Sequence, residues 1–274
     1  MRRAEKQKGW CAALVAEARH SALPLALCLT SSVSAQDIAQ PRPLPFAIGE
    51  RFTYAARAES MGISGKGQMW VEGPVDVRGV STWLLRFEVK AGFGQIGGSE
   101  RSSSWIDATR MTALRYVKRE RRVLAGHEEA VELFPDESRW VGKDGTSGTI
   151  ATSLPLDELS FIYFIRTLPL AVDSVYSMDR HFDARRNPTV IRVLGREIVE
   201  TRAGTFRTLK VEMTVKDPHN YDKVGVIRLL LSDDARRIPV RIESEMSKAG
   251  TVTLTLESHN CPAPSTAAVG GGGD

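Results

Sequence analysis

The chain has 274 residues, of which 42% are apolar, 26% charged and 7% aromatic, so its composition excludes a disordered or low-complexity protein. Three cysteines, at positions 11, 28 and 261, are too few and too scattered for a disulfide framework, a zinc cluster or an iron–sulfur site. The net charge of +4 is mildly basic, and whether it indicates a nucleic-acid or membrane-surface partner depends on where the charges lie.

Residues 1–35 form a predicted signal peptide for export. Five basic residues precede the apolar run 22–29, and the small residues 33–35 provide an expected cleavage site. The apolar run is too short to cross the roughly 30 Å hydrocarbon core of a membrane, so we expect no transmembrane anchor in the mature chain. Removal of this segment leaves a net charge of about +1. We therefore expect a periplasmic or secreted protein with no nucleic-acid partner.

The mature chain divides into three expected parts. Residues 36–45 form an extended, proline-rich leader, residues 46–260 a single β-rich domain, and residues 261–274 a flexible tail with four consecutive glycines. No linker rich in proline, glycine and serine divides the central region, which is why we expect one domain there. Cys261 is expected to be an unpaired thiol without a catalytic role.

The central region is predicted to be mainly β, as a curved antiparallel sheet or a partly open β-barrel. Its signal is a period-two alternation of apolar and polar residues in short runs separated by glycine, aspartate and proline. Seven runs precede the middle of the chain, at 52–56, 67–72, 81–90, 101–107, 111–122, 128–134 and 138–142. Seven more follow it, at 176–183, 189–194, 196–202, 205–216, 225–232, 239–247 and 251–258. Ala203 and Gly204 form the clearest hairpin turn.

Two motifs in the first half resemble functional sequences but favour structural roles. Residues 92–97 match G-x-G-x-x-G, yet an alternating strand follows where a dinucleotide site needs a helix, so we predict a hairpin loop. The densest group of basic residues, at 115–122, precedes the acidic segment 127–132. In a hairpin these two segments pair opposite charges across strands, which we favour over a nucleic-acid surface.

One segment, 155–168, is predicted to be a helix. Pro155, Asp157 and Glu158 suit its first turn and Arg166 its last. Residues 161–165 are apolar around nearly the whole circumference, so we place the helix in the concavity of the sheet. It either fills the core or lines an apolar ligand cavity. The candidate ligand-binding residues are Leu159, Phe161, Ile162, Tyr163 and Ile165.

No residue is predicted to be catalytic, to bind a metal or to hold a cofactor. The mature histidines, at 127, 181, 219 and 259, lack partners at the spacing of metal ligands. The triplet His181-Phe182-Asp183 is predicted to lie on an exposed strand. Hydrolase carboxylates remain an open possibility, because paired acids on distant strands leave no local signature.

Four segments, taken in order, resemble the exported bacterial family of unknown function DUF3108. They are FAIGERFTY at 46–54, LSFIYFIRTLPL at 159–170, GRE with AGTF at 195–206 and LSDDARRIPV at 231–240. The resemblance implies an exported, mostly β protein and carries no established activity or catalytic residues. More loosely, a curved sheet with an apolar helix in its concavity looks like the fold of periplasmic lipoprotein carriers, which is an analogy of fold only.

The leading functional hypothesis is a non-enzymatic periplasmic binding module that holds a lipid or other apolar group between sheet and helix. A second hypothesis is a structural or interaction protein in cell-envelope assembly, with an envelope protein as its partner. A third is a hydrolase with paired carboxylates, which requires convergent, buried acids with raised pKa values.

Overall fold

The computed structural model describes residues 43–58, 62–93, 96–122, 125–217, 220–246 and 250–262. The predicted signal peptide, most of the leader and the tail beyond Pro262 lie outside the described residues, as does His219.

Fourteen strands occur in the described part of the chain. The first eight are β1 (Arg51–Ala58), β2 (Ile63–Val77), β3 (Val80–Phe93), β4 (Ile96–Asp107), β5 (Thr112–Arg122), β6 (Ala125–Phe134), β7 (Arg139–Gly142) and β8 (Ser147–Thr149). The helix α1 (Glu158–Thr167) follows, and then β9 (Val175–Met178), β10 (Thr189–Thr201), β11 (Gly204–Lys216), β12 (Val224–Ser232), β13 (Pro239–Met246) and β14 (Gly250–Asn260). Two short 3-10 helices, η3 (Pro135–Glu137) and η4 (Ala184–Arg186), lie between these elements.

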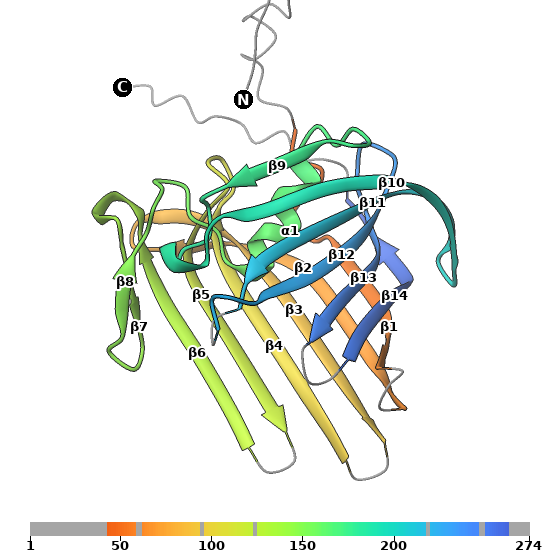
Figure 1. Cartoon of the computed structure of the whole chain (residues 1–274), viewed down its shortest axis with the longest axis horizontal. Coiled ribbons are helices and arrows are strands. Elements are labelled where there is room, and N and C mark those ends of the chain that lie inside the picture. The colour runs from red at the N-terminus through yellow and green to blue at the C-terminus, as the bar shows by residue number, and fades with distance from the viewer. Residues whose placement is uncertain are drawn as a thin grey trace, which may run out of the picture. The chain divides into compact units, whose positions relative to one another are not determined.

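All fourteen strands belong to one antiparallel sheet, in the order β8-β7-β6-β5-β4-β3-β2-β1-β14-β13-β12-β11-β10-β9. Consecutive strands are neighbours in the sheet, except for β8 and β9, which form its two edges, and the pairing of β1 with β14 joins the two ends of the domain. No pairing between β8 and β9 closes the described strands into a barrel. The long strands β3–β6 form one wall, and β9–β12 cross in front of its upper end with α1 between them (Figure 1). The expected curved, partly open β fold is confirmed.

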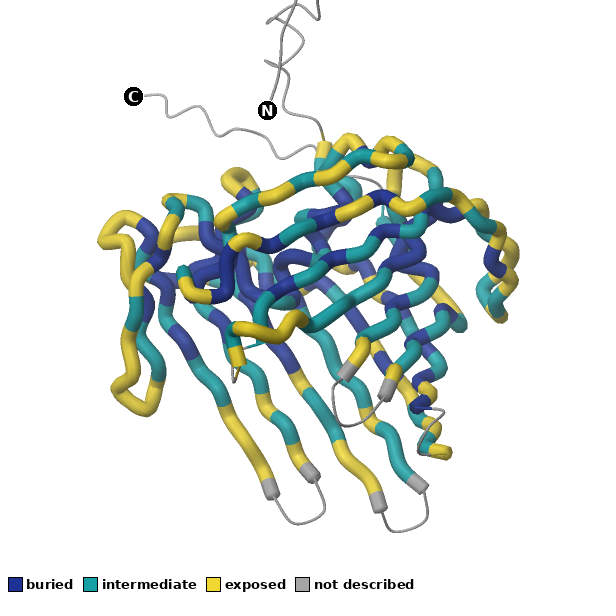
Figure 2. The backbone as a smooth tube through the Cα atoms, in the orientation of Figure 1, coloured by how far each residue is buried: buried dark blue, intermediate teal, exposed yellow. Residues whose placement is uncertain are grey.

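The hydrophobic core lies on the concave side of this sheet, around α1. In β1 the side chains of Phe52, Tyr54 and Ala56 are buried, whereas Ala55 and Arg57 alternate to the outer face. The buried segments gather around the helix, and the lower ends of β3–β6 extend beyond it as half-buried and exposed residues (Figure 2). The helix therefore covers only part of the concave face.

Local hydrogen bonds explain why α1 begins where it does. Asp157 is the N-cap, and its carboxylate accepts bonds from the amides of Leu159 at 2.9 Å and Ser160 at 3.0 Å. The Ser160 hydroxyl accepts a bond from the Asp157 amide at 2.8 Å, which completes a capping box. The second carboxylate oxygen of Asp157 bonds the Ser104 hydroxyl of β4 at 2.5 Å, so the cap also fastens the helix to the sheet.

Several local expectations are confirmed and several are wrong. The glycine motif at 92–97 lies in the β3–β4 hairpin, and the basic segment of β5 pairs with the acidic segment of β6. The two runs expected at 189–202 form one strand, β10, because a bulge at Gly195 shifts the register without ending the strand. The strand expected at 176–183 ends at Met178, and His181 is fully buried, contrary to the prediction that it lies on an exposed strand.

Candidate ligand-binding site on the concave face

The five candidate helix residues occupy two environments. Leu159, Phe161, Tyr163 and Ile165 are at most 3% exposed and belong to the hydrophobic core. Ile162 is half-buried and packs against the edge of that core. It lies four residues after Glu158, so both side chains lie on the same face of α1. Ile162 is the one predicted ligand-binding residue that remains partly exposed to solvent.

Glu158 begins a charged cluster at the N-terminal end of α1. Its carboxylate accepts a hydrogen bond from Arg186 of η4, and its Oε1 atom lies 3.5 Å from the Nε2 atom of His181. Burial opposes ionisation of Glu158, but Arg186 and His181 together lower its pKa well below the usual range. Burial lowers the pKa of His181 in spite of Glu158, so this imidazole is neutral at neutral pH.

Below the helix, the register of the sheet places alternate residues of β3–β6 in two rows on the concave face. The upper row contains Phe87, Ser102, Lys118 and Glu129 on successive strands. The lower row contains Val89, Glu100, Glu120 and His127. Each row is apolar on β3 and polar or charged on β4, β5 and β6, so this part of the concave face is amphipathic.

Lys118 is the central cation of the two rows. Its ammonium nitrogen lies 2.9 Å from Oε1 of Glu120 and 3.7 Å from Oε2 of Glu100. Burial raises the pKa of Glu100, and the neighbouring Glu120 carboxylate adds to the rise. Burial opposes protonation of Lys118, but the Glu100 and Glu120 carboxylates raise its pKa overall. Lys118 is therefore a stable ammonium group shared by two acids.

Glu129 is the carboxylate of this surface with no ion pair among the described residues. It is half-buried opposite Lys118 on the neighbouring strand, and burial together with the charge of Glu158 raises its pKa. Burial likewise raises the pKa of the helix cap Asp157 to about 7. Acids with raised pKa values therefore converge on the N-terminal end of α1, as the hydrolase hypothesis requires.

The sequence predicts that the basic segment 115–122 pairs opposite charges with the acidic segment across the strands of a hairpin. Arg115 and Arg119 do pair there, with Glu132 and Glu128. Lys118 has the opposite parity and faces the same side as the buried Tyr116. The sequence does contain a signal for this placement of Lys118. Charged residues occur on both faces of β5, which is unusual for a strand with one buried face.

Comparison with known proteins identifies the family. The profile of DUF3108, described as a protein of unknown function, matches residues 53–257. The chain belongs to the DUF3108 family. This match spans β1 to β14 and includes both rows of the concave face. A search of curated protein sequences finds no significant match to this DUF3108 protein.

Solved structures resemble this DUF3108 chain in fold. A β-barrel-like DUF1849 protein from Brucella abortus has a TM-score of 0.53 and 11% identity, covering 78% of this chain and 98% of its own. A presumed lipoprotein from Parabacteroides distasonis has a TM-score of 0.33 and 10% identity, covering 81% and 100%. A presumed exported protein with a YmcC-like fold from Bacteroides fragilis has a TM-score of 0.30 and 15% identity, covering 80% and 98%. The first likeness supports the β-barrel-like fold alone.

Two further observations concern the described residues only. They include no helix that is both long and apolar enough to span a membrane. They also include no group of three or more histidine, cysteine, aspartate or glutamate side chains placed to hold a metal ion.

Proposed function

We propose that this DUF3108 protein is an exported, non-enzymatic binding module for an amphiphile. The apolar part of the ligand lies against Phe87, Val89 and Ile162, and its polar head lies beside Glu129. Export rests on the basic and apolar pattern of residues 1–35, and the binding domain is proposed to span residues 46–260.

The amphipathic character of the two rows carries this proposal. Phe87, Val89 and Ile162 are half-buried and border the hydrophobic core, so a ligand that covers them removes apolar surface from water. Such burial stabilises a complex by about 25 cal/mol for each Å². The charged groups of β5 and β6 lie two and three strands away from the apolar residues of β3, at a spacing of about 4.8 Å per strand, which a head group attached to an alkyl chain can reach.

The charge of the surface favours an ammonium head group. On the two rows, the three acids Glu100, Glu120 and Glu129 outnumber Lys118, which is the one lysine or arginine among them. Arg186 is another cation that acts on Glu129, but it is already bonded to Glu158. A cation beside Glu129 supplies the partner that this carboxylate lacks within the described chain. It also stabilises the ionised form of a group whose pKa is raised by burial.

Ligands that share one chain length test the proposal. Displacement of a fluorescent apolar probe is measured at pH 7 with dodecylamine, dodecanol and dodecanoate. The amine is expected to bind at least tenfold more tightly than the acid, and Glu129→Gln is expected to remove most of this preference. Glu128→Gln is the matched control, because Glu128 bonds Arg119 on the outer face. Equal affinities for the three ligands would overturn the choice of head group.

A charge placed on the apolar part of the surface tests the binding site itself. Val89→Asp is expected to weaken the binding of all three ligands at least tenfold, because the alkyl chain would lie against a carboxylate. Ile198→Asp is the control, since Ile198 is 71% exposed on β10. Unchanged binding in Val89→Asp, with the fold intact by circular dichroism, would refute the proposed site.

A hydrolase with paired carboxylates is the second candidate, favoured by the raised pKa values of Glu100 and Glu129. Against it, Lys118 lies within ion-pair distance of both Glu100 and Glu120. Incubation with nitrophenyl glycosides and esters separates the candidates. Release of nitrophenol that is lost in Glu100→Gln would support the hydrolase over the binding module.

A further inference from the structure

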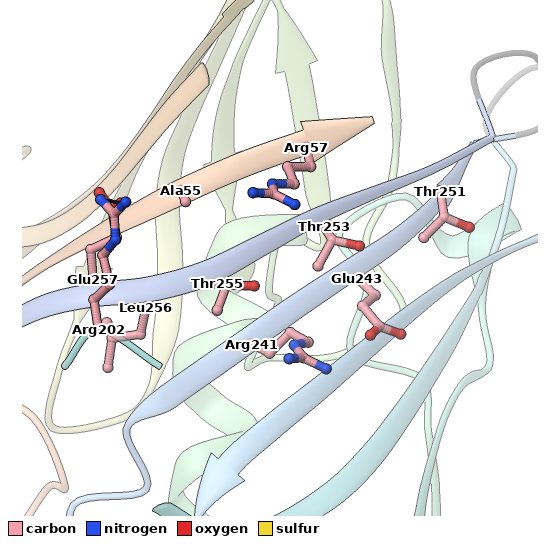
Figure 3. Close-up of a pocket in the computed structure, with 10 residues that line it drawn as sticks. All are labelled: Ala55, Arg57, Arg202, Arg241, Glu243, Thr251, Thr253, Thr255, Leu256 and Glu257. Atoms are coloured by element: carbon pink, nitrogen blue, oxygen red, sulfur yellow. Dashed lines mark hydrogen bonds and ion pairs between the residues drawn. The ribbon is translucent and has the colours of Figure 1, made fainter. Parts of the chain in front are cut away.

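A second candidate site lies on the outer face of the sheet, on the opposite side from the proposed amphiphile site. It is a pocket of about 800 Å³ over β1, β13 and β14, bordered by the turn of the β10–β11 hairpin (Figure 3). This volume lies within the range of roughly 300–1,000 Å³ that is usual for small-molecule sites. We propose that this pocket binds a phosphate group carried by a small, hydroxyl-bearing molecule.

Strand register brings the polar side chains of the pocket together. Thr253 of β14 is paired with Arg57 of β1 on one side and with Glu243 of β13 on the other. Two residues further along β14, Thr255 is paired with Arg241 of β13. Figure 3 shows the guanidinium groups of Arg57 and Arg241 on either side of these threonines. Two arginines therefore face one row of hydroxyl groups.

These two arginines differ from several other arginines on the outer face. There, Arg115, Arg119 and Arg228 form ion pairs with glutamates on neighbouring strands. The guanidinium groups of Arg57 and Arg241 form no ion pair or hydrogen bond with the described residues, and the register places threonine beside them on β14. The fold thus leaves two guanidinium groups without an anion inside one pocket.

The Nε atom of Arg241 is an independent sign of a missing partner. This atom is buried and has no hydrogen-bond acceptor within the described chain. A buried donor without an acceptor is costly, and a planar guanidinium suits two phosphate oxygens at once. A phosphate in the pocket would pair with the terminal nitrogens of this guanidinium and supply the anion that the described residues do not provide.

Arg202, in the turn of the β10–β11 hairpin, contributes to an excess of positive charge in the pocket by pairing with Glu257. Glu257 bonds both Lys66 and Arg202, the second at 2.8 Å, and these cations lower its pKa. Glu257 is therefore already neutralised, and Arg57 and Arg241 face Glu243 alone. Because Glu243 is acceptor-only when ionised, it suits a ligand hydroxyl group rather than the phosphate. This combination points to a phosphorylated polyol or sugar.

Calorimetry on the full mature chain with glucose 6-phosphate, glucose and inorganic phosphate tests this inference. Glucose 6-phosphate is expected to bind most tightly, and glucose not at all at about 10 mM. Vesicles containing phosphatidylglycerol form a separate arm, and binding only to these would assign the phosphate to a lipid head group. Absence of binding to every phosphate-bearing probe would overturn the proposal.

Variants separate a built site from general charge attraction. Arg57→Gln and Arg241→Gln are each expected to weaken glucose 6-phosphate binding at least tenfold. Arg119→Gln makes the same charge change elsewhere on the outer face and is expected to have no effect. Equal losses in all three variants would refute a specific site. Glu129→Gln is expected to retain phosphate binding. A failure of the proposed amphiphile site on the concave face can therefore be distinguished from a failure of the phosphate site on the outer face.

Discussion

The buried ion pair between Arg166 and Glu50 provides the sharpest test of how α1 is held in the sheet. The Arg166 side chain is fully buried and Glu50 is 2% exposed. Two hydrogen bonds of 2.7 and 2.8 Å join the guanidinium to the carboxylate. The guanidinium also donates to the carbonyl oxygens of Pro45 and Arg236, each at 3.0 Å. One side chain thus connects the C-terminal end of α1 to the leader, the start of β1 and the turn before β13.

Glu50→Gln is the chosen perturbation, because it keeps the shape of the side chain and removes its charge. Loss of one partner from a buried ion pair typically costs about 3–5 kcal/mol, since the remaining charge lacks compensation. For a domain of about 215 residues, 1 kcal/mol corresponds to roughly 2–4 °C in Tm, so we expect Tm to fall by about 10 °C. Rings of Phe46, Phe52 and Tyr163 lie 5.2–5.5 Å from the guanidinium and offer partial compensation only.

Thermal and urea unfolding followed by circular dichroism measure this effect. Glu137→Gln is the control, because Glu137 pairs with Arg139 at the surface and both side chains are about half exposed. Surface pairs of this kind contribute about 0–1 kcal/mol. The double variant Glu50→Leu with Arg166→Met is expected to be more stable than Glu50→Gln, since it removes both charges. A cost below about 1 kcal/mol for Glu50→Gln would refute the reasoning.

Two further predictions concern the helix cap and the sheet. The folded pKa of Asp157 is about 7, above an unfolded value of about 3.9, so its contribution to stability is present below pH 4 and is lost as pH rises towards 7. Urea unfolding of wild type and Asp157→Asn at several pH values is expected to show this loss only in wild type, on the order of a few kcal/mol; parallel pH profiles would contradict it. Gly65→Ala is expected to destabilise β2 strongly, because its Cβ atom would lie 1.9 Å from the carbonyl oxygen of Lys90. Gly225→Ala, whose nearest contact is an ordinary 3.8 Å, is expected to lower Tm much less, and equal shifts would argue against the clash.

The sequence carried most of the information about the architecture. Period-two alternation located the strands, because a sheet with one buried face requires it. The all-round apolar segment 161–165 predicted a covered helix, and α1 does lie in the concavity with Phe161, Tyr163 and Ile165 in the core. The opposite charges of β5 and β6 also predicted pairing across these strands, and Arg115 and Arg119 do pair with Glu132 and Glu128. These features depend on local periodicity, which a single chain displays directly.

Side-chain environments that depend on distant contacts were not predictable in this way. His181 was expected on an exposed strand, but it is buried against α1, because its segment leaves the sheet after Met178. Arg166 suited the last turn of the helix as a cation near its negative end, but its partner Glu50 lies 116 positions earlier in the chain. Neither contact leaves a pattern within the segment itself.

The two candidate sites show where local sequence information ends. The sequence by itself determined which residues alternate along each strand and that one apolar helix must be covered. Only the tertiary structure decided that Arg57 and Arg241 border one pocket, because the pairing of β1 with β14 joins the two ends of the domain. It likewise decided that Lys118 lies between Glu100 and Glu120 on the concave face, since strand register sets which side chains meet.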